Sequence, residues 1–512
     1  MISRCLEQFV LGILLVAVPG LIHAITIHIK RSKFIKAQGC QAPQKHIELK
    51  DPFIGLDFLF DSIFKRTPET YLDHAHEDFI RLGQTYTAKR WTYETIFTCN
   101  ELNIKQILAL GFEDFELPEI RVSAMSSLLG RGIFTMNGLA WSHARGILRP
   151  CFTKQNLEPL NDLLEHHLQA LIRRIPSDGS TVDLQPLFFE LTMDVASEFL
   201  MGESTHTLDR ASSHHREQQF VDDYMICSTI CSQKMQMGPL HNFVFSLAGR
   251  RAKNRVLQYV DGYVDKFLHR DRRIGHLRYD VLSELSRSTD DRTVLRDQVL
   301  HVLLASRDTA ASLLSNLFFA LAKRPQVWAK LREEVIGVAG SEGVTAEQLR
   351  DVTYLRWCVQ EALRLYPVVP TNARSATKDT TLPQGGGPDG KSPLFIRKGA
   401  VVVYNLYSLH RDPNIYGDDP EEFRPERWAG LRPGWSYLPF SGGPRICIGQ
   451  HYALKELSYI AARMVQTFET MQSMDDSKWT ELYALVMTCK NGVHVSLKRP
   501  HGETREDCAK IR

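Results

Sequence analysis

The first long apolar stretch in the chain covers residues 9–29. Its 21 residues are mostly apolar and are interrupted by Pro19, His23, Thr26 and His28. A helix of this length is about 31 Å long, which matches the roughly 30 Å hydrocarbon core of a bilayer. The pattern therefore predicts a transmembrane helix near the N-terminus.

The charges beside this stretch predict its orientation. The basic residues that follow it are Lys30, Arg31, Lys33 and Lys36, whereas only Arg4, beside Glu7, precedes it. Because basic flanks stay on the cytosolic side of a membrane, we expect the body of the protein in the cytosol. Two other interpretations stay open, a buried helix and a cleaved signal peptide with Ile22 and Ala24 at a poor cleavage site.

Helical spacing of apolar residues dominates the rest of the chain. It marks Thr153–Ile175 and Glu217–Met235 within a mostly helical region from about 68 to 280, and residues 203–216 are polar and predict a surface loop. Two further helices are expected over about Val294–Lys323 and Ala329–Ala339, the first ending before Pro325.

Strand patterns appear late and are short. We expect strands over Leu394–Ile396 and Ala400–Tyr404, and a final hairpin around Asn491-Gly492. The fold class is therefore mainly α with a minor β component. The expected division is an anchor with its basic flank (1–36), a linker (37–55), a catalytic domain (56–500) and a tail (501–512).

Composition excludes several classes of protein. Hydrophobic residues make up 43% and charged residues 24%, and the net charge of +3 is too small for a nucleic-acid surface. None of the ten cysteines forms a C-x-x-C pair, which excludes zinc-ribbon and thioredoxin-like sites. Dispersed cysteines without an N-x-[ST] sequon fit reduced thiols in the cytosol.

The chemistry concentrates in residues 440–449, Phe-Ser-Gly-Gly-Pro-Arg-Ile-Cys-Ile-Gly. A thiolate ligand of haem iron must be deprotonated, rigidly held and shielded. Gly442 and Gly443 would let the backbone pass close to a flat macrocycle, and Gly449 would do so beyond the ligand. Arg445 could pair with a haem propionate. The simpler interpretation, a structural cysteine in a glycine-rich turn, does not explain the whole pattern.

This run resembles the cysteine-ligand loop of the cytochrome P-450 superfamily, F-x-x-G-x-R-x-C-x-G. The fixed positions of that motif are Phe440, Gly443, Arg445, Cys447 and Gly449 here. The resemblance covers nearly the whole chain and implies the cytochrome P-450 fold. It also implies haem b, with Cys447 as the axial thiolate that binds iron.

Further motifs follow in the order that the superfamily has. Glu361-Ala-Leu-Arg364 resembles its E-x-x-R helix, and Phe423–Trp428 resembles the segment whose arginine, here Arg427, completes a buried ion network. Trp141 and Arg145 resemble its W-x-x-x-R pair, which contacts haem propionates, as Arg374 would. Taken alone, a Glu–Arg pair three residues apart is usually a weak surface bridge.

The oxygen-activating segment is Ala305-Ser-Arg-Asp-Thr309, in the long helix. Ala305 and Thr309 share one helix face, where a small residue leaves space for O₂. The Thr309 hydroxyl and the Asp308 carboxylate are expected to relay protons. The superfamily has glycine where this chain has Ser306, which could bond the carbonyl of Val302 instead. In an ordinary helix such a threonine would only bond its own backbone.

Residues 385–392 match the phosphate-binding pattern G-x-x-x-x-G-K-[ST] letter for letter. A functional phosphate loop opens a long helix, whereas Pro383 and Pro393 flank this run and a strand follows it. We therefore expect a surface hairpin loop here and no bound nucleotide.

Several stretches resemble the fungal branch of the superfamily that hydroxylates n-alkanes and fatty acids. These stretches are residues 50–57, 305–309, 371–375, 382–393 and 442–450. The pocket positions implied beside the haem are apolar or nearly so: Ala305, Val368, Val369, Thr371, Val486 and Met487. Apolar lining favours a lipophilic substrate, although the same residues could be plain core.

The resemblance implies a monooxygenase that inserts one oxygen atom of O₂ into a C–H bond of a long-chain, fatty-acid- or alkane-like substrate. Electrons would come from NADPH-cytochrome P-450 reductase at the endoplasmic reticulum membrane. One alternative is a monooxygenase that tailors a polyketide or terpenoid in fungal secondary metabolism. More distant alternatives are an O₂-independent haem-thiolate isomerase or dehydratase and a non-catalytic haem-binding protein.

Overall fold

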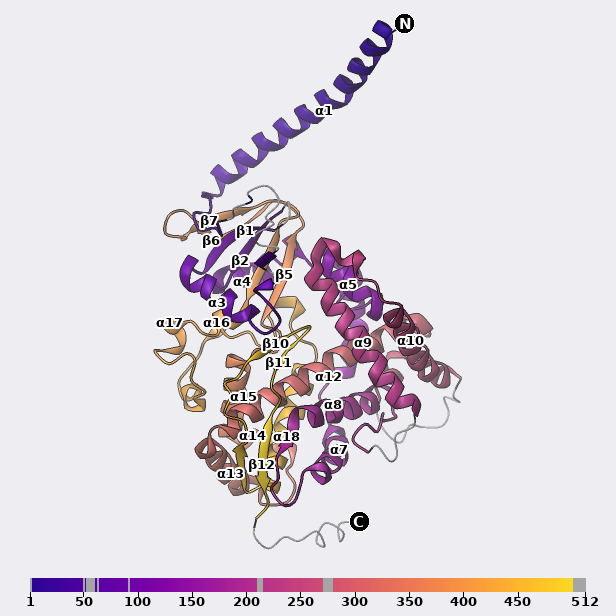
Figure 1. The fold of residues 1–512 in the computed structure, drawn as a ribbon, viewed down its shortest axis with the longest axis vertical. Helices are drawn as coiled ribbons and strands as arrows, with labels where there is room; N and C mark the ends of the chain where they lie inside the picture. The colour runs from indigo at the N-terminus through magenta and orange to yellow at the C-terminus, as the bar shows by residue number, and fades with distance from the viewer. Residues whose placement is uncertain are drawn as a thin grey trace.

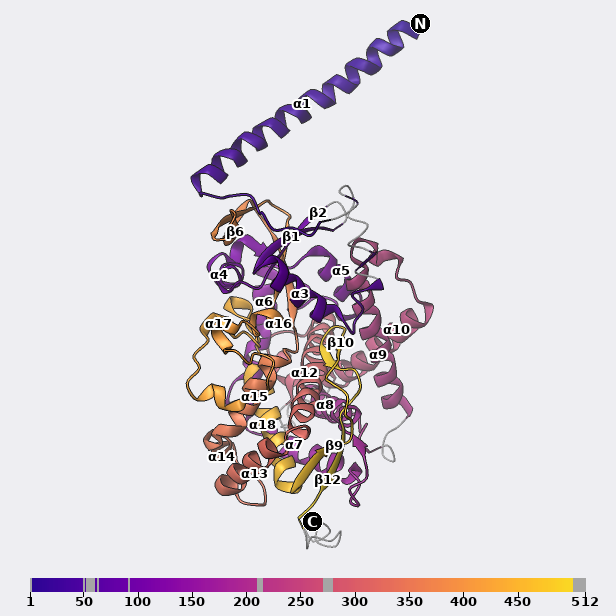
Figure 2. The ribbon, with the colours of Figure 1, turned by 60° about the vertical axis from the view of Figure 1, so that its left-hand side comes forward.

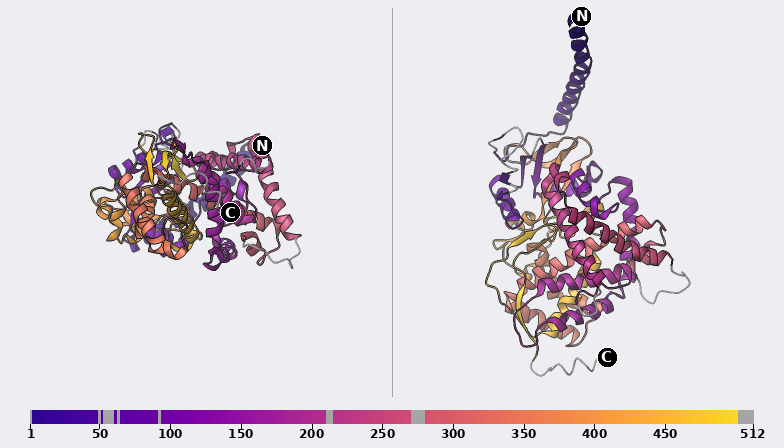
Figure 3. Two further views of the ribbon diagram at one scale, coloured as in Figure 1. Left: turned by 90° about the horizontal axis from the view of Figure 1, so that it is seen from below. Right: turned by 45° about the vertical axis from the view of Figure 1, so that its right-hand side comes forward.

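The computed structural model describes residues 2–48, 51, 60–61, 64–90, 93–209, 215–269 and 280–500, without the side chains of residues 2–17, 90, 93 and 239. Helix α1 (Ile2–Ala37) extends away from the body of the protein (Figures 1 and 3). No helix among the residues searched, which are the described ones, is long and apolar enough to cross a membrane. Part of the predicted span, residues 9–17, has its side chains outside the described set.

The body has a sheet-rich part beside the base of α1 and a helical part beyond it (Figure 2). The main sheet has the strand order β1 (Thr85–Arg90), β2 (Tyr93–Thr98), β8 (Val401–Asn405), β5 (Thr371–Ala376) and β3 (Phe115–Glu116). Only β2 and β8 pair in parallel among these neighbours. The structure is therefore mainly helical with small sheets, as the sequence predicts.

Helix α12 (Arg292–Ala322) runs through the core of the helical part, beside α8 (Leu184–Met201) (Figure 1). It packs also on α15 (Thr353–Leu365) and α18 (Gln450–Thr467). The other α-helices in the described ranges are α3 (Tyr71–Leu82), α4 (Glu101–Lys105), α5 (Glu119–Leu129), α6 (Gly138–Leu148), α7 (Leu160–Arg174), α9 (His215–Met237), α10 (Leu247–Leu268), α11 (Val281–Leu285), α13 (Pro325–Ala339), α14 (Ala346–Asp351), α16 (Leu406–Leu409) and α17 (Pro413–Tyr416). The helices predicted at 217–235, 294–323 and 329–339 are confirmed as α9, α12 and α13.

The predicted final hairpin is wrong. Strand β11 (Met487–Cys489) pairs with β10 (Glu481–Tyr483), whereas β12 (His494–Lys498) pairs with β9 (Thr470–Ser473) and β4 (Val182–Asp183). Gly492 does adopt a left-handed conformation, with φ of 78°. The Asn-Gly pair therefore turns the chain, but the strands on its two sides find partners in different sheets.

The prediction of a surface loop at residues 203–216 is also wrong in part. Thr205, Thr207 and Leu208 are buried, because the backbone and hydroxyl groups of this segment bond the Asp194 carboxylate on α8. Polar composition indicated a surface segment, but here the polar groups are satisfied in the interior.

Candidate active site

The loop of residues 440–449 precedes α18 and presents Cys447 outward. The Cys447 amide donates to the Phe440 carbonyl at 2.9 Å, and the Ile446 amide donates to the Gly443 carbonyl at 3.0 Å. Cys447 is the only exposed cysteine among those that the structure describes. The loop is thus closed by its own backbone and leaves one thiol accessible.

Contacts within the protein give a further reason for two glycines in this loop, beside the predicted approach to a macrocycle. A Cβ on Gly443 would lie 1.8 Å from the Leu108 carbonyl oxygen, and its φ of 66° disfavours any side chain. A Cβ on Gly442 would lie 2.9 Å from the Trp435 ring. At Gly449 the nearest atom would be 3.7 Å away, an ordinary contact. Packing of protein against protein therefore requires the first two glycines, while nothing in the chain crowds Gly449.

The protein around Cys447 acts on its ionisation in two directions. Desolvation raises the pKa of the thiol, whereas a backbone N–H of Gly449 and the charge of Arg145 oppose that rise. Arg145 lies beside the loop, because its Nη2 donates to the Ile446 carbonyl at 2.8 Å.

Four arginines gather near this loop from separate elements. Arg121 (α5) and Arg374 (β5) both donate to Asn372 Oδ1, at 2.7 and 3.1 Å. Arg145 and Arg445 lie over the Trp141 ring, with guanidinium carbons 5.8 and 4.3 Å from its centroid. The hydrogen bonds described for these four side chains go to backbone carbonyls or to amide oxygens.

This cluster of like charges is electrostatically unfavourable in the protein alone. Burial and the neighbouring Arg374, Arg121 and Arg145 lower the pKa of Arg445 to about 9. Burial and Arg374 lower the pKa of Arg121 to about 10, and its buried Nε has no partner in the described structure. Such a donor set fits an anion with several oxygens. Arg121 is not a residue that any motif in the sequence singled out.

Helix α12 has one narrow stripe of half-buried residues within its buried length. Between residues 297 and 322 all side chains are buried except those of Ala305, Ser306 and Thr309, which are half-buried. Thr309 Oγ1 donates to the Ala305 carbonyl at 2.5 Å, and Ser306 Oγ donates to the Val302 carbonyl at 2.9 Å. The predicted Ser306–Val302 bond is therefore present, and the small and hydroxyl side chains share the accessible face.

Asp308 lies elsewhere on α12, in the interior. Its carboxylate accepts a hydrogen bond from Arg307 Nη1 at 2.6 Å, and both side chains are nearly fully buried. Arg307 also contacts the Phe189 ring at 4.9 Å and bonds Met225 Sδ. Burial raises the pKa of Asp308, although the Arg307 charge opposes the rise. Asp308 and Thr309 thus occupy different environments.

The structure brings Glu361, Arg364 and Arg427 together in the core. Arg364 donates twice to the Glu361 carboxylate at 2.9 Å, and Arg427 Nε donates to it at 2.8 Å. The Trp428 indole and the Arg424 amide complete its shell. Since the pair is fully buried, it differs from a weak surface bridge and joins α15 to the segment that leads toward the cysteine loop.

The predicted pocket residues fall into two groups. Val369 is exposed, while Ala305, Thr371 and Val486 are half-buried, and Thr371 Oγ1 lies 2.7 Å from the Tyr483 hydroxyl. Val368 and Met487 are buried, and Ser312 donates to the Met487 carbonyl. Their positions fit the core interpretation better than a pocket wall.

The phosphate-loop-like run lies in a hairpin. Strands β6 (Thr380–Gly386) and β7 (Ser392–Ile396) pair antiparallel, and residues 387–391 connect them. The predicted surface hairpin is confirmed, since no helix begins at the run.

Comparison with known proteins agrees with this geometry. Residues 50–495 match the family cytochrome P450. The chain is 42% identical to cytochrome P450 monooxygenase himC of Aspergillus japonicus, over 90% of this chain and 84% of the relative. It is 39% identical to cytochrome P450 monooxygenase fsdH of Fusarium heterosporum, over 96% and 89%. It is 38% identical to cytochrome P450 52A12 of Debaryomyces hansenii, over 91% and 93%.

The chain therefore belongs to the cytochrome P450 monooxygenase family. Membership implies a haem-thiolate group, and the residues of this site fit one. An accessible thiol lies on a rigid loop, a stripe of small and hydroxyl side chains is open on α12, and four guanidinium groups lie near the loop.

Proposed function

We propose that this protein is a membrane-anchored haem-thiolate monooxygenase that hydroxylates an unactivated C–H bond of a lipophilic, long-chain substrate. The observation that carries the proposal is the accessible Cys447 thiol on a backbone-closed loop, accompanied by four arginines that lack a bonded carboxylate in the described structure. Haem b, when bound, would supply oxygen activation through an iron centre that is tuned by its thiolate ligand.

The chain's own residues would hold the group at three places. Cys447 Sγ would be the ligand atom, and Phe440 would support the loop through its carbonyl. Arg121, Arg145, Arg374 and Arg445, with Trp141, would bind the two propionates. Bidentate guanidinium–carboxylate pairs would offset the burial and the neighbouring arginine charges that together lower the pKa of Arg445.

Proton delivery would use the two environments on α12. Thr309 lies in the half-buried stripe, and its hydroxyl would donate a proton to a group bound there after its hydrogen bond to the Ala305 carbonyl breaks. The Asp308 carboxylate, paired with Arg307 in the interior, would take up a proton and pass it on once that bond opens. Glu361, Arg364 and Arg427 would act at a distance by keeping the loop rigid.

The apolar residues proposed to line the pocket and the proposed membrane anchor both favour a lipophilic substrate. The half-buried candidates Ala305, Thr371 and Val486 offer little charge to a ligand, and the sequence resembles the fungal branch that hydroxylates alkanes and fatty acids. A lipid-soluble substrate fits a domain held by the apolar stretch 9–29 at the endoplasmic reticulum, with electrons from NADPH-cytochrome P450 reductase. The second candidate is tailoring of a polyketide or terpenoid, for which the same apolar lining would serve.

The test compares Cys447→Ala with Cys40→Ala, a control that removes another thiol from the chain. We expect the control to give a thiolate-type carbon monoxide difference spectrum and NADPH-dependent product, and Cys447→Ala to give neither. Retained turnover in Cys447→Ala would contradict the assignment. Titration of the native enzyme with fatty acids, alkanes and polycyclic compounds then separates the substrate classes by the high-spin shift each produces.

A further inference from the structure

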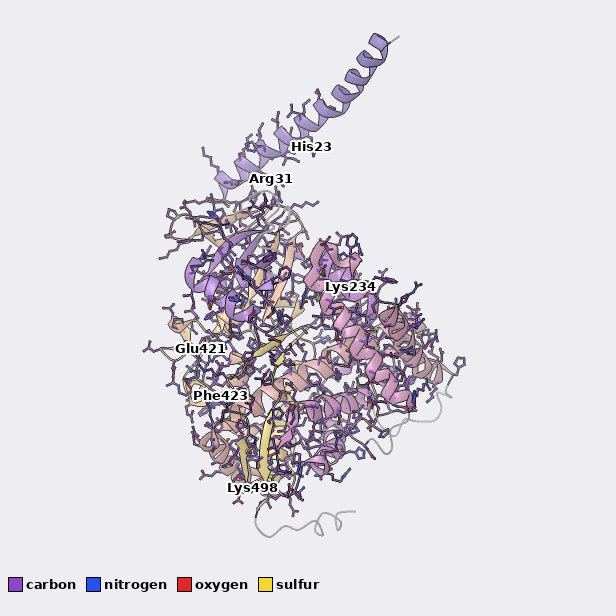
Figure 4. The ribbon with its side chains drawn as sticks, viewed as in Figure 1. His23, Arg31, Lys234, Glu421, Phe423 and Lys498 are labelled. Carbon is purple, nitrogen blue, oxygen red and sulfur yellow. The ribbon has the colours of Figure 1, made fainter. Side chains whose placement is uncertain are left out.

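The last turns of α1 contact the body along one face. From residue 18 to residue 37 the half-buried side chains are those of Ile27, Arg31, Phe34 and Ile35, and all others are exposed. This spacing marks a single helical stripe. Phe34 packs edge-on against Phe395 of β7, with ring centroids 5.9 Å apart. The base of the helix is therefore seated on the β6–β7 hairpin (Figure 4, where Arg31 is labelled at this contact).

An ion pair holds the centre of this contact. Arg31 Nε and Nη2 donate to the two oxygens of Asp379 at 2.8 and 3.0 Å, across 348 residues. The Lys398 amide donates to the same carboxylate at 2.8 Å, so Asp379 joins α1 to both ends of the hairpin. Two-point geometry fixes direction as well as distance, which a single contact would not.

The chain that leaves α1 continues the contact with backbone bonds. The Gln41 amide donates to the Pro393 carbonyl at 2.9 Å, and the Gly387 amide donates to the Ala42 carbonyl at 3.1 Å. A Cβ on Gly386 would lie 2.6 Å from both the Gln41 and the Pro393 carbonyl oxygens. The close approach of residues 41–43 thus explains glycine in the run that imitates a phosphate loop.

Residues 45–47 extend the attachment to the main sheet. Ile47 and Lys45 exchange backbone hydrogen bonds with Thr87 of β1, at 2.9 and 3.0 Å. The predicted linker is therefore bonded to the body over residues 41–47. The bidentate ion pair and the aromatic contact join α1 to the sheet-rich part, and four backbone bonds join residues 41–47 to it.

We propose that the β6–β7 hairpin is a socket that locks α1 to the catalytic body, so that the anchor and the body move as one unit. This inference rests on the proposed membrane anchor. A locked anchor holds the body at one tilt and height over the bilayer, whereas a free linker would let it swing. The glycines at 385–387 allow residues 41–43 to approach the hairpin closely enough for this attachment.

The test is hydrogen exchange of the full-length protein, in detergent and in lipid nanodiscs, read by mass spectrometry over residues 38–48 and 384–394. Variants Arg31→Gln and Asp379→Asn remove either half of the ion pair. Lys33→Gln is the matched control, because it removes the same charge from an exposed position two residues further along α1.

In the native protein we expect slow exchange at the Gln41 and Gly387 amides. Arg31→Gln and Asp379→Asn should each raise the exchange rate of these amides at least about tenfold. The double variant should exchange little faster than either single variant, and Lys33→Gln should leave the rate unchanged. Unprotected exchange in the native protein, or equal behaviour of Arg31→Gln and Lys33→Gln, would overturn the socket. Alkaline carbonate extraction of membranes that contain the native full-length protein reports separately on the anchor: release of the protein would overturn the anchor even if the amides are protected.

Discussion

The guanidinium groups of Arg121 and Arg374 both donate to one neutral acceptor, the side-chain oxygen of Asn372, at 2.7 and 3.1 Å. Two cations that share an amide oxygen repel each other, and burial together with the Arg374 charge lowers the pKa of Arg121 to about 10. An anion with two negative charges, bound between Arg121 and Arg374, would offset the repulsion between their guanidinium groups.

Arg121→Ala should weaken haem retention because it removes one of these donors. We expect the rate of haem transfer to apomyoglobin to rise roughly tenfold, which corresponds to about 1.4 kcal/mol, in the range of a charged hydrogen bond. Arg131→Ala is the control, since this exposed arginine follows α5 and its side chain has no described partner in the site. Equal loss from both variants would show that α5 acts through general stability.

Thr309→Ala should separate electron use from product formation. The variant keeps the helix, because the bond from Thr309 Oγ1 to the Ala305 carbonyl is local, but it removes the hydroxyl from the accessible stripe. We expect NADPH consumption to continue while product per NADPH falls about tenfold or more. Thr309→Ser, which keeps the hydroxyl, should retain most of the coupling. Unchanged coupling in Thr309→Ala would remove this residue from the relay.

Gly443→Ala and Gly449→Ala should differ, although both glycines belong to the same motif. A Cβ at 443 collides with the Leu108 carbonyl in a left-handed conformation, whereas one at 449 meets only Phe152 at 3.7 Å. We expect Gly443→Ala to lower the free energy of unfolding of the apoprotein by about 2 kcal/mol or more, and Gly449→Ala by well under 1 kcal/mol. Urea unfolding followed by circular dichroism measures both. Similar losses would contradict the geometry of the loop.

Glu456 predicts a pH dependence of stability. It is buried in α18 with one carboxylate oxygen unpaired, and burial raises its pKa to about 8 from an ordinary value near 4.5. Since the folded state holds the proton more tightly, this group's contribution is complete below pH 4.5 and is lost as the pH rises to about 8.

Glu456→Gln removes that titration. Relative to the native protein, the variant should gain stability progressively from pH 4.5 to 8 and no further above it. Chemical unfolding at a series of pH values measures the difference. A difference that does not change with pH would mean that Glu456 is ionised in the fold or has a partner.

Local sequence patterns predicted the site residues that belong to motifs of a few consecutive residues. Cys447, Glu361 and Arg364 lie in motifs whose spacing is itself the signal, and α12 was predicted within two residues of its ends. Arg121 could not be found this way, because a single arginine in a helix has no local pattern and acquires meaning only beside Arg374 and Arg445.

Pairing between distant strands was the other gap. Strands β1 and β2 are joined through Trp91-Thr92, which lacks the glycine or asparagine that usually marks a hairpin, and the sequence predicted helix over this region. Asn491-Gly492 has the turn signal, but the strands on its two sides, β11 and β12, do not pair with each other. Turn residues report local backbone conformation, whereas partners are chosen by burial across the whole fold.

The contact of Gly443 with the Leu108 carbonyl sets an order for maturation. One side of the cysteine loop is formed by residues made early in synthesis and the other by residues made near its end. A nascent chain that ends before residue 440 would lack the loop that closes on residues 106–110. A haem held by Cys447, as proposed, could therefore bind only after residues 440–449 have been synthesised, and a chain truncated before residue 440 would lack the proposed ligand.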